Sequence, residues 1–139
     1  GRLFRLLFGK RNRAHRCLRL TGFEFEEYMA QVLRDNGFRR VEVTVECGDQ
    51  GVDILAVRGG KTYAIQCKNY TGAVGNTAVQ EAYAGAEYYG CDIPVVVCPT
   101  DFTVPESTGV ELWDGERLSH MMRVSGRRPH HDPSRDDEL

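Results

Sequence analysis

The chain has 139 residues, of which 41% are hydrophobic and 27% are charged, and its formal net charge is −2. This length supports one domain with a single core, and the composition is that of a globular protein. No stretch approaches the roughly 20 apolar residues that a membrane-spanning helix requires, so the sequence predicts no membrane span within this chain.

The basic residues are concentrated at the N-terminus. Residues 1–20 contain seven Lys and Arg residues and no acid, so residues 21–139 hold 11 basic and 20 acidic residues. A basic footprint over the whole domain is absent, and any DNA contact must depend on a local patch, the N-terminal arm or metal ions. We predict that residues 1–20 are a poorly ordered basic lead-in. Two alternatives stay open: an arm that grips phosphates, or the cytoplasmic flank of an upstream membrane helix.

Five cysteines occur, at positions 17, 47, 67, 91 and 98. Their number is odd and no CxxC motif is present. This pattern predicts reduced cysteines in a cytoplasmic protein, most of them serving as small core residues.

The first predicted helix begins at Thr21. Thr21 and Glu24 have the spacing of a capping box, and the helix ends at Asn36-Gly37 with a left-handed cap. Glu26 lies about 100° around the helix from the first apolar residue, at the edge of the buried stripe. Its position alone favours a solvated carboxylate. The stripe itself consists of Phe25, Tyr28, Met29, Val32 and Leu33.

Residues 40–46 alternate between polar and apolar types and predict a half-exposed strand, followed by a turn at residues 47–51. Asp49 and Gln50 in this turn can approach a substrate, although turn residues need no function. Two apolar runs on either side of Gly59-Gly60 then predict a β-hairpin with a two-residue loop.

The register of this hairpin decides which polar side chains meet. A loop of Gly59 and Gly60 places Asp53 opposite Gln66, and alternation then puts Asp53, Gln66 and Lys68 on one face. An Asp within an apolar strand is unfavourable unless its charge is compensated. Two explanations stay open: an Asp53–Lys68 ion pair that supports the hairpin, or a metal ion such as Mg²⁺ bound by Asp53 and the Gln66 oxygen.

The second half of the chain predicts a strand–helix–strand unit. A helix capped by Asn76 or Thr77 runs to Tyr89, with Tyr83 in its core stripe and Gln80 beside that stripe. The continuous apolar run at residues 93–98 predicts a central strand covered on both faces.

The C-terminal part predicts two short elements and a tail. Residues 110–113 form the last strand, and a short helix follows over about residues 116–122. Residues 124–139 are polar and charged with two prolines, and they predict a disordered tail. The order of all these elements implies an α/β sandwich. Metal binding is indicated only weakly by His120, His130 and His131.

A resemblance to a known family rests on several short segments. Gly51-Val-Asp53 followed by Gln66-Cys-Lys68 resembles the PD-(D/E)xK nuclease signature in its Gln-x-Lys variant, as in Mrr-type restriction endonuclease domains. The signature alone is weakly specific, but the ordered set of matching segments between Thr21 and Leu118 is strong. These segments are residues 48–53, 65–70, 74–76, 79–81 and 109–115.

This resemblance implies a restriction-endonuclease-like three-layer sandwich, an α/β fold with a central mixed β-sheet flanked by helices. Members of the family usually carry a full helix before the last strand, and residues 104–109 are too short to form one.

The resemblance also implies a metal-dependent DNA endonuclease site. The catalytic residues are then Asp53, Gln66, Lys68 and Glu26, where Glu26 matches the helix glutamate that completes the metal site in the family. The implied Mg²⁺ ligands are Asp53, Gln66, Glu26 and the backbone carbonyl of Cys67, with Mn²⁺ as a substitute. Lys68 would position the attacking water and stabilise the transition state. The predicted DNA-contacting residues are Gln80, Gln50 and Asn69.

Together these features divide the chain into a basic arm or linker at residues 1–20, a nuclease-like domain at 21–123 and a polar tail at 124–139. The predicted partner is DNA, including modified or foreign DNA, and a homodimer is one way to cut both strands. The predicted location is the cytoplasm, or its membrane face if an upstream segment provides an anchor.

The alternative function is a non-catalytic nucleic-acid- or protein-binding module on the same fold. The excess of acidic residues over residues 21–139 and the shortened segment before Val110 favour this alternative. In that case Lys68 would pair with Asp53 as a structural ion pair. In a nuclease, Glu26, Asp53 and Gln66 would converge with room for a cation.

Overall fold

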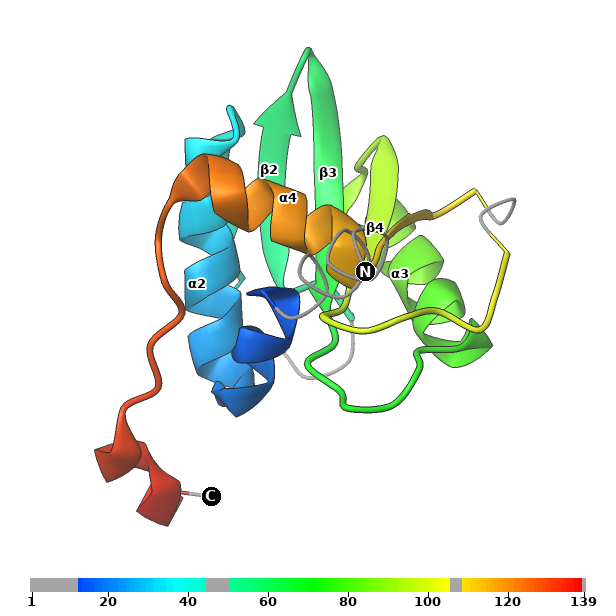
Figure 1. Cartoon of the computed structure of the whole chain (residues 1–139). Helices are drawn as coiled ribbons and strands as arrows, with labels where there is room; N and C mark the ends of the chain where they lie inside the picture. Colours follow the sequence, from blue (N-terminus) through cyan, green and yellow to red (C-terminus); the bar gives the residue numbers. More distant parts are fainter. Residues whose placement is uncertain (1–12, 45–50, 106–108, 139) are drawn as a thin grey trace, which may run out of the picture.

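The computed structural model describes residues 13–44, 51–105 and 109–138, and these residues form one five-stranded sheet with helices on both faces (Figure 1). The antiparallel part of the sheet joins β1 to β2 and β2 to β3, and the parallel part joins β3 to β4 and β4 to β5. The predicted three-layer α/β sandwich with a central mixed sheet is therefore confirmed. In sheet order, which is also chain order, the strands are β1 (Arg39–Val43), β2 (Ile54–Arg58), β3 (Lys61–Cys67), β4 (Ile93–Val97) and β5 (Glu111–Trp113).

One face of the sheet is covered by α2 (Gly22–Asp35) and α4 (Gly115–Ser125). The predicted capping box is present, because the Thr21 hydroxyl accepts from the Glu24 amide and the Glu24 carboxylate accepts from the Thr21 amide. Burying each large apolar side chain of α2 contributes roughly 1.5–3 kcal/mol. This burial fixes the rotation of the helix and leaves Glu26 half-buried at its edge. The fully buried side chains of the stripe are Phe25, Met29, Val32 and Leu33.

The opposite face is covered by α3 (Asn76–Tyr89), which packs on β3 and β4. Its N-cap is Gly75, with no side-chain cap bond, so the predicted caps Asn76 and Thr77 were wrong by one or two residues. Tyr83 is 52% exposed and does not belong to the core stripe. Small side chains make the contact and bring α3 close to the sheet. The buried residues are Ala78, Val79, Ala82, Gly85 and Ala86.

The connection between β4 and β5 is short, as predicted from its length. Its described residues, 98–105 and 109–110, contain no helix. Phe102 and Val104 are half-buried against an apolar cluster that includes Val79 and Leu112. The shortened connection therefore covers apolar surface that would be exposed if neither this connection nor a helix lay over it.

The N-terminal segment differs from the predicted basic lead-in. Residues 13–15 are helical and lead into the 3₁₀-helix η1 (Arg16–Arg19). Ala14 and Cys17 are fully buried, and Leu20 is nearly so, in the same core as α2 and α4. The apolar residues between the arginines explain this packing. Residues 1–12 lie outside the described residues, so the interpretations of that part stay predictions.

The C-terminal segment also differs from the expected disordered tail. The chain leaves α4 at Gly126, runs beside α2 and ends in the 3₁₀-helix η3 (Pro133–Glu138) (Figure 1). Arg127 Nε lies 2.6 Å from Asp35 Oδ2, and the Tyr28 hydroxyl donates to the Arg127 carbonyl at 2.8 Å. Polar and charged composition alone predicted disorder, but here these groups find partners on α2.

Within residues 13–44, 51–105 and 109–138, no helix combines the length and the apolar character needed to cross a bilayer.

β1 ends at Val43, three residues earlier than predicted. Residues 45–50 lie outside the described residues, and they include Gln50.

Candidate active site

The hairpin that carries the predicted site has the expected register. Arg58 pairs with Lys61, and Ile54 pairs with Ile65. Gly59 and Gly60 have φ angles of 59° and 75°, the left-handed conformation that a tight hairpin turn requires at both central positions. The two-residue loop and the register derived from it are confirmed.

Asp53 lies one residue before β2, where regular alternation ends. Val52 packs with Ala64 and Ala86 on the α3 side, whereas Ile54 packs in the core beneath α2. The Asp53 side chain therefore does not simply continue the ladder. Its Oδ2 atom accepts a 2.7 Å hydrogen bond from the Cys67 amide and so joins the beginning of β2 to the end of β3.

Gln66 and Lys68 meet on the α3 side of the sheet through a third residue. Glu81 Oε2 accepts from Gln66 Nε2 at 2.7 Å and lies 3.5 Å from Lys68 Nζ. Lys68 Nζ also donates to the Tyr70 hydroxyl at 3.4 Å. The carboxylate partner of Lys68 is thus Glu81, and among the described residues no ion pair joins Lys68 to Asp53. The postulated Asp53–Lys68 structural pair is not formed.

Sequence reasoning missed Glu81 as a site residue. It followed Gln80 in one of the segments that resembled the nuclease family, and this was the available signal. Its role appears only when α3 is placed against β3, because 15 residues separate it from Gln66.

The amide oxygen of Gln66 has no partner in the described part of the chain. Gln66 is 3% exposed, and its Oε1 atom is buried without a hydrogen bond to these residues. Gly51, with φ of 66°, packs against this amide: a Cβ atom there would lie 3.3 Å from two atoms of Glu81 and 3.4 Å from Gln66 Nε2. A buried unsatisfied acceptor is unfavourable by about 1–3 kcal/mol, which makes it a position suited to a ligand.

Lys68 is held as a cation. Burial lowers the pKa of its ammonium, but the hydrogen bond to Tyr70 and the charge of Glu81 outweigh burial, and the net effect raises the pKa. Its Nζ atom also lies 5.4 Å from the centre of the Tyr70 ring. At neutral pH Lys68 is therefore protonated and can neutralise negative charge.

Two further carboxylates approach the end of β3 near the Cys67 thiol. Burial is the largest cause that raises the pKa of this thiol, and the charges of Asp53 and Glu26 raise it further. The charges of Asp53 and Glu26 therefore both act on Cys67, the residue after Gln66. The Cys67 side chain packs against the core beneath α2, whereas the Gln66 amide binds Glu81 of α3 on the other face of the sheet. Among the described residues no three His, Cys, Asp or Glu side chains are grouped as a metal site. The available oxygen donors are two carboxylates, one amide and main-chain carbonyls, which suit a hard cation such as Mg²⁺.

The predicted DNA-contacting residues have different environments. Gln80 is exposed on α3. Asn69 is half-buried, and its Nδ2 atom donates to the Leu20 carbonyl at 2.7 Å, while its Oδ1 atom is buried without a partner among the residues that the structure describes. Gln50 lies outside the described residues.

The family of the chain follows from its sequence as a whole. The family model Mrr_cat, described as a restriction endonuclease, matches residues 17–122. This chain belongs to the Mrr_cat restriction endonuclease family. The match includes Glu26, Asp53, Gln66, Lys68 and Glu81, and membership of this family supports a nuclease function in general.

Solved structures share the fold of this Mrr_cat domain. The crystal structure of AF1548, a protein of unknown function, has a TM-score of 0.66 at 23% identity and covers 84% of this chain and 76% of that chain. The DNA modification-dependent restriction endonuclease AspBHI has a TM-score of 0.62 at 16% identity, covering 87% of this chain and 37% of that chain. At these identities the likeness shows the fold alone. No curated protein matches this chain in sequence.

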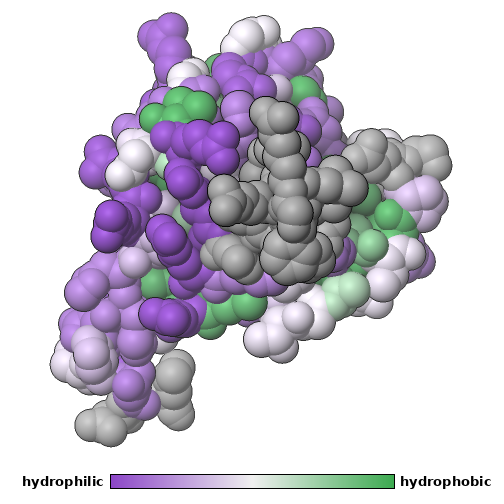
Figure 2. All heavy atoms as spheres, in the orientation of Figure 1, coloured by the Kyte–Doolittle hydropathy of each residue, from purple (hydrophilic) through white to green (hydrophobic). Residues whose placement is uncertain are grey.

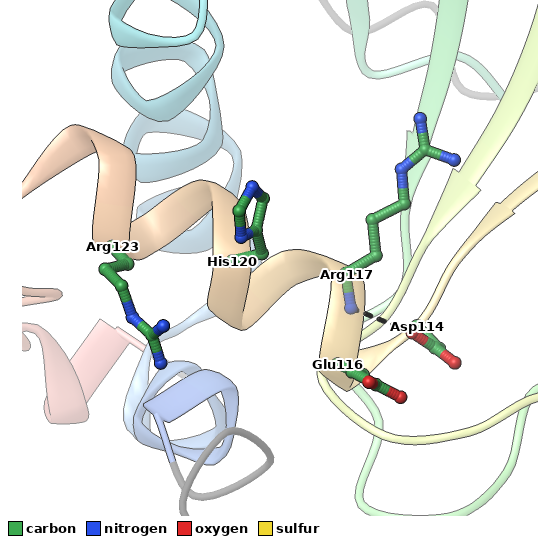
Figure 3. Close-up of a pocket in the computed structure, with 5 residues that line it drawn as sticks. All are labelled: Asp114, Glu116, Arg117, His120 and Arg123. Atoms are coloured by element: carbon green, nitrogen blue, oxygen red, sulfur yellow. Dashed lines mark hydrogen bonds between the residues drawn. The ribbon is translucent and has the colours of Figure 1, made fainter. Parts of the chain in front are cut away.

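A separate cavity of about 380 Å³ lies along α4 of the Mrr_cat domain (Figure 3). Its side chains point in different directions instead of toward one point. Asp114 caps α4 by accepting from the Arg117 amide, and the Arg117 guanidinium lies 5.0 Å from the centre of the Trp113 ring. These contacts stabilise the helix, and the described residues around this cavity lack the convergent polar groups found at the end of β3.

Proposed function

We propose that this Mrr_cat domain is a metal-dependent DNA endonuclease that hydrolyses phosphodiester bonds where β2 begins and β3 ends. The observation that carries the proposal is the Gln66 amide. Its nitrogen donates a hydrogen bond to Glu81, and its oxygen is buried and has no partner among the described residues. The next residue in the chain is Cys67, whose backbone amide donates to Asp53. An acceptor in this state fits a cation ligand better than a purely structural amide.

The proposed metal is Mg²⁺, with Mn²⁺ as a substitute. Asp53, Gln66, Glu26 and the Cys67 carbonyl are the residues that would hold it. When bound, Mg²⁺ supplies positive charge at the scissile phosphate and lowers the pKa of bound water. Because Gln66 contributes a neutral oxygen, we expect modest metal affinity in the absence of DNA.

Lys68 has the role of positioning the attacking water and stabilising the charge that develops on the phosphate. The raised pKa of its ammonium supports this role over that of a general base, since a protonated lysine cannot accept a proton. Glu81 acts as a positioning residue because it orients both Lys68 and Gln66.

We also propose that Gln80, Gln50 and Asn69 contact the DNA near the cleaved bond. The substrate includes modified or foreign DNA, in keeping with AspBHI, which is a DNA modification-dependent restriction endonuclease. A homodimer in the cytoplasm provides two sites for cutting both strands.

The test is a plasmid cleavage assay with Mg²⁺ or Mn²⁺ on methylated and unmethylated DNA. We expect metal-dependent nicking by the wild type and a loss of about 10²-fold or more in Lys68→Ala and Asp53→Asn. Lys61→Ala is the matched control, since Lys61 is exposed beside the hairpin loop. Calorimetric titration with Mn²⁺ measures binding independently, and we expect weaker binding by Asp53→Asn.

The result that contradicts the proposal is an inactive wild type on both kinds of DNA, with melting temperatures that respond to none of the metals. That outcome would favour the non-catalytic binding module. The acidic net balance of residues 21–139 is the observation on that side.

A further inference from the structure

Three arginines line one cavity of about 430 Å³. Arg16 and Arg19 belong to η1, and Arg128 lies in the segment after α4, beside His130 and His131. The described residues that line this cavity include no carboxylate. We call it the arginine cavity.

Three other arginines have carboxylate partners, and two of these arginines belong to the same C-terminal segment as Arg128. Arg127 lies 2.6 Å from Asp35, Arg117 lies 3.4 Å from Glu111, and Arg135 lies 3.8 Å from Glu27. In the described part of the chain, Arg16, Arg19 and Arg128 form no ion pair. They are exposed, and like charges held together are unfavourable unless an anion binds between them.

The histidines contribute less free charge. His131 uses both ring nitrogens, since each lies 2.7 Å from a carboxylate oxygen, one of Glu24 and one of Asp136. These contacts fix the position of the segment that carries Arg128. The surface over α2 and the C-terminal segment is hydrophilic in Figure 2.

One hydrogen bond connects the arginine cavity to the end of the segment that carries the proposed active site. Leu20 lines the cavity, and its carbonyl accepts the 2.7 Å hydrogen bond from Asn69 Nδ2. Asn69 directly follows Lys68 in the chain. This hydrogen bond therefore ties the segment just after Lys68 to the segment that lines the arginine cavity.

We propose that the arginine cavity binds a phosphate of the DNA backbone next to the phosphodiester that is cut. This inference rests on the proposed nuclease function and adds a second, sequence-independent contact to it. Guanidinium groups hold phosphates through paired, charge-assisted hydrogen bonds. The three guanidinium groups line one hollow, so the cavity suits a single phosphate group. A local cluster of arginines also explains how a domain with more acidic than basic residues can bind DNA.

The test measures DNA binding apart from cleavage. Fluorescence anisotropy with a labelled duplex in EDTA compares the wild type with Arg16→Gln/Arg128→Gln and with Arg39→Gln/Lys61→Gln. The control pair lies on exposed residues near the hairpin-loop end of the sheet, and both variants lose two positive charges. Thermal melting checks that each is folded, and Arg19→Gln is a milder third variant.

We expect the arginine-cavity variant to bind DNA about tenfold more weakly or worse, while the control pair stays within about twofold of the wild type. The dependence of log K on log salt should become shallower by about one unit for each phosphate that the variant no longer binds. The single Arg19→Gln variant should fall between the wild type and the double variant.

Equal weakening in both double variants would overturn the inference, because affinity would then depend only on net charge. Unchanged DNA binding by the arginine-cavity variant, with a wild type that still cleaves, would overturn it and leave the nuclease proposal standing. Selective weakening with a wild type that never cleaves would support the cavity and refute the nuclease proposal. If the arginine-cavity variant loses its binding to phosphatidylserine vesicles but keeps its binding to DNA, a membrane is the partner instead.

Discussion

At the scale of single residues, Glu81 connects the two functional side chains of β3. One carboxylate oxygen binds the Gln66 amide nitrogen and lies beside the Lys68 ammonium. The first contact sets the direction of the Gln66 oxygen, and the second contributes to the raised pKa of Lys68. The effect of Glu81 on the orientation of Gln66 and its effect on the pKa of Lys68 can therefore be separated by substitution.

We predict different pH profiles for two variants at this position. Glu81→Gln keeps an acceptor for Gln66 but removes the charge that raises the pKa of Lys68, so the alkaline limit of cleavage should move to lower pH. Glu81→Ala removes both contacts and should lower activity at every pH. The measurement is plasmid nicking as a function of pH.

Glu87→Gln is the control for this experiment, since Glu87 is exposed on the same helix. Identical profiles for the wild type and Glu81→Gln would mean that the charge of Glu81 does not act through Lys68.

At the scale of elements, the contact between α2 and the C-terminal segment depends on protonation. The Glu24 carboxylate accepts hydrogen bonds from the Asp132 amide and from His131, besides its capping bond with Thr21. These bonds, that of the Asp132 amide foremost, lower the pKa of Glu24 from 4.5 to about 2. The hydrogen bonds to Glu24 and then to Asp136 raise the pKa of His131 above 6.5.

The sign of the pH effect follows from these two shifts. A raised histidine pKa stabilises the fold fully below about pH 6.5, and this stabilisation disappears as pH rises through the folded value. A lowered glutamate pKa stabilises the fold above about pH 4.5, and this stabilisation disappears as pH falls toward 2. The contact should be strongest between about pH 4.5 and 6.5.

We therefore predict that hydrogen exchange of residues 127–138 accelerates as pH rises above about 6.5, after correction for the intrinsic rate. In His131→Ala this pH dependence should disappear, whereas His120→Ala, on the exposed face of α4, should behave as the wild type. The Arg135–Glu27 and Arg127–Asp35 pairs do not involve His131 and should keep the segment attached. A pH dependence that is unchanged in His131→Ala would contradict the prediction.

At the scale of the whole molecule, the core joins segments from both ends of the described chain. Cys17 before α2 contacts Met122 of α4, and the Ala14 amide donates to the Ser119 hydroxyl. Burial raises the pKa of Cys17 to about 12 and that of Cys98 to about 11. Thiolates are the reactive form, so both thiols should be inert in the native state.

We predict that a thiol-alkylating reagent modifies Cys17 and Cys98 only when the protein unfolds, while the half-buried Cys91 reacts before either of them. Peptide mapping after labelling with and without urea measures the order. Labelling of Cys17 as fast as that of Cys91 would mean that residues 13–20 do not pack as described.

Much of the fold could be predicted from local pattern. The capping box at Thr21, the apolar stripe of α2 and the hairpin around Gly59-Gly60 depend on residues close together in the chain. The failures concern long-range partners. Tyr83 had the spacing of a core residue but lies outside the contact that α3 makes through its small residues.

Local patterns in the chain were enough to predict the order of the elements, the register of the hairpin and the resemblance to a nuclease family, because periodicity, turn chemistry and short motifs depend on neighbouring residues. The pairing of Lys68 with Glu81 instead of Asp53 became visible only in the folded chain, as did the packing of the polar C-terminal segment beside α2, which completes the arginine cavity. The physical reason is that a charged side chain binds the opposite charge that packing brings nearest, and sequence spacing does not reveal which one that is.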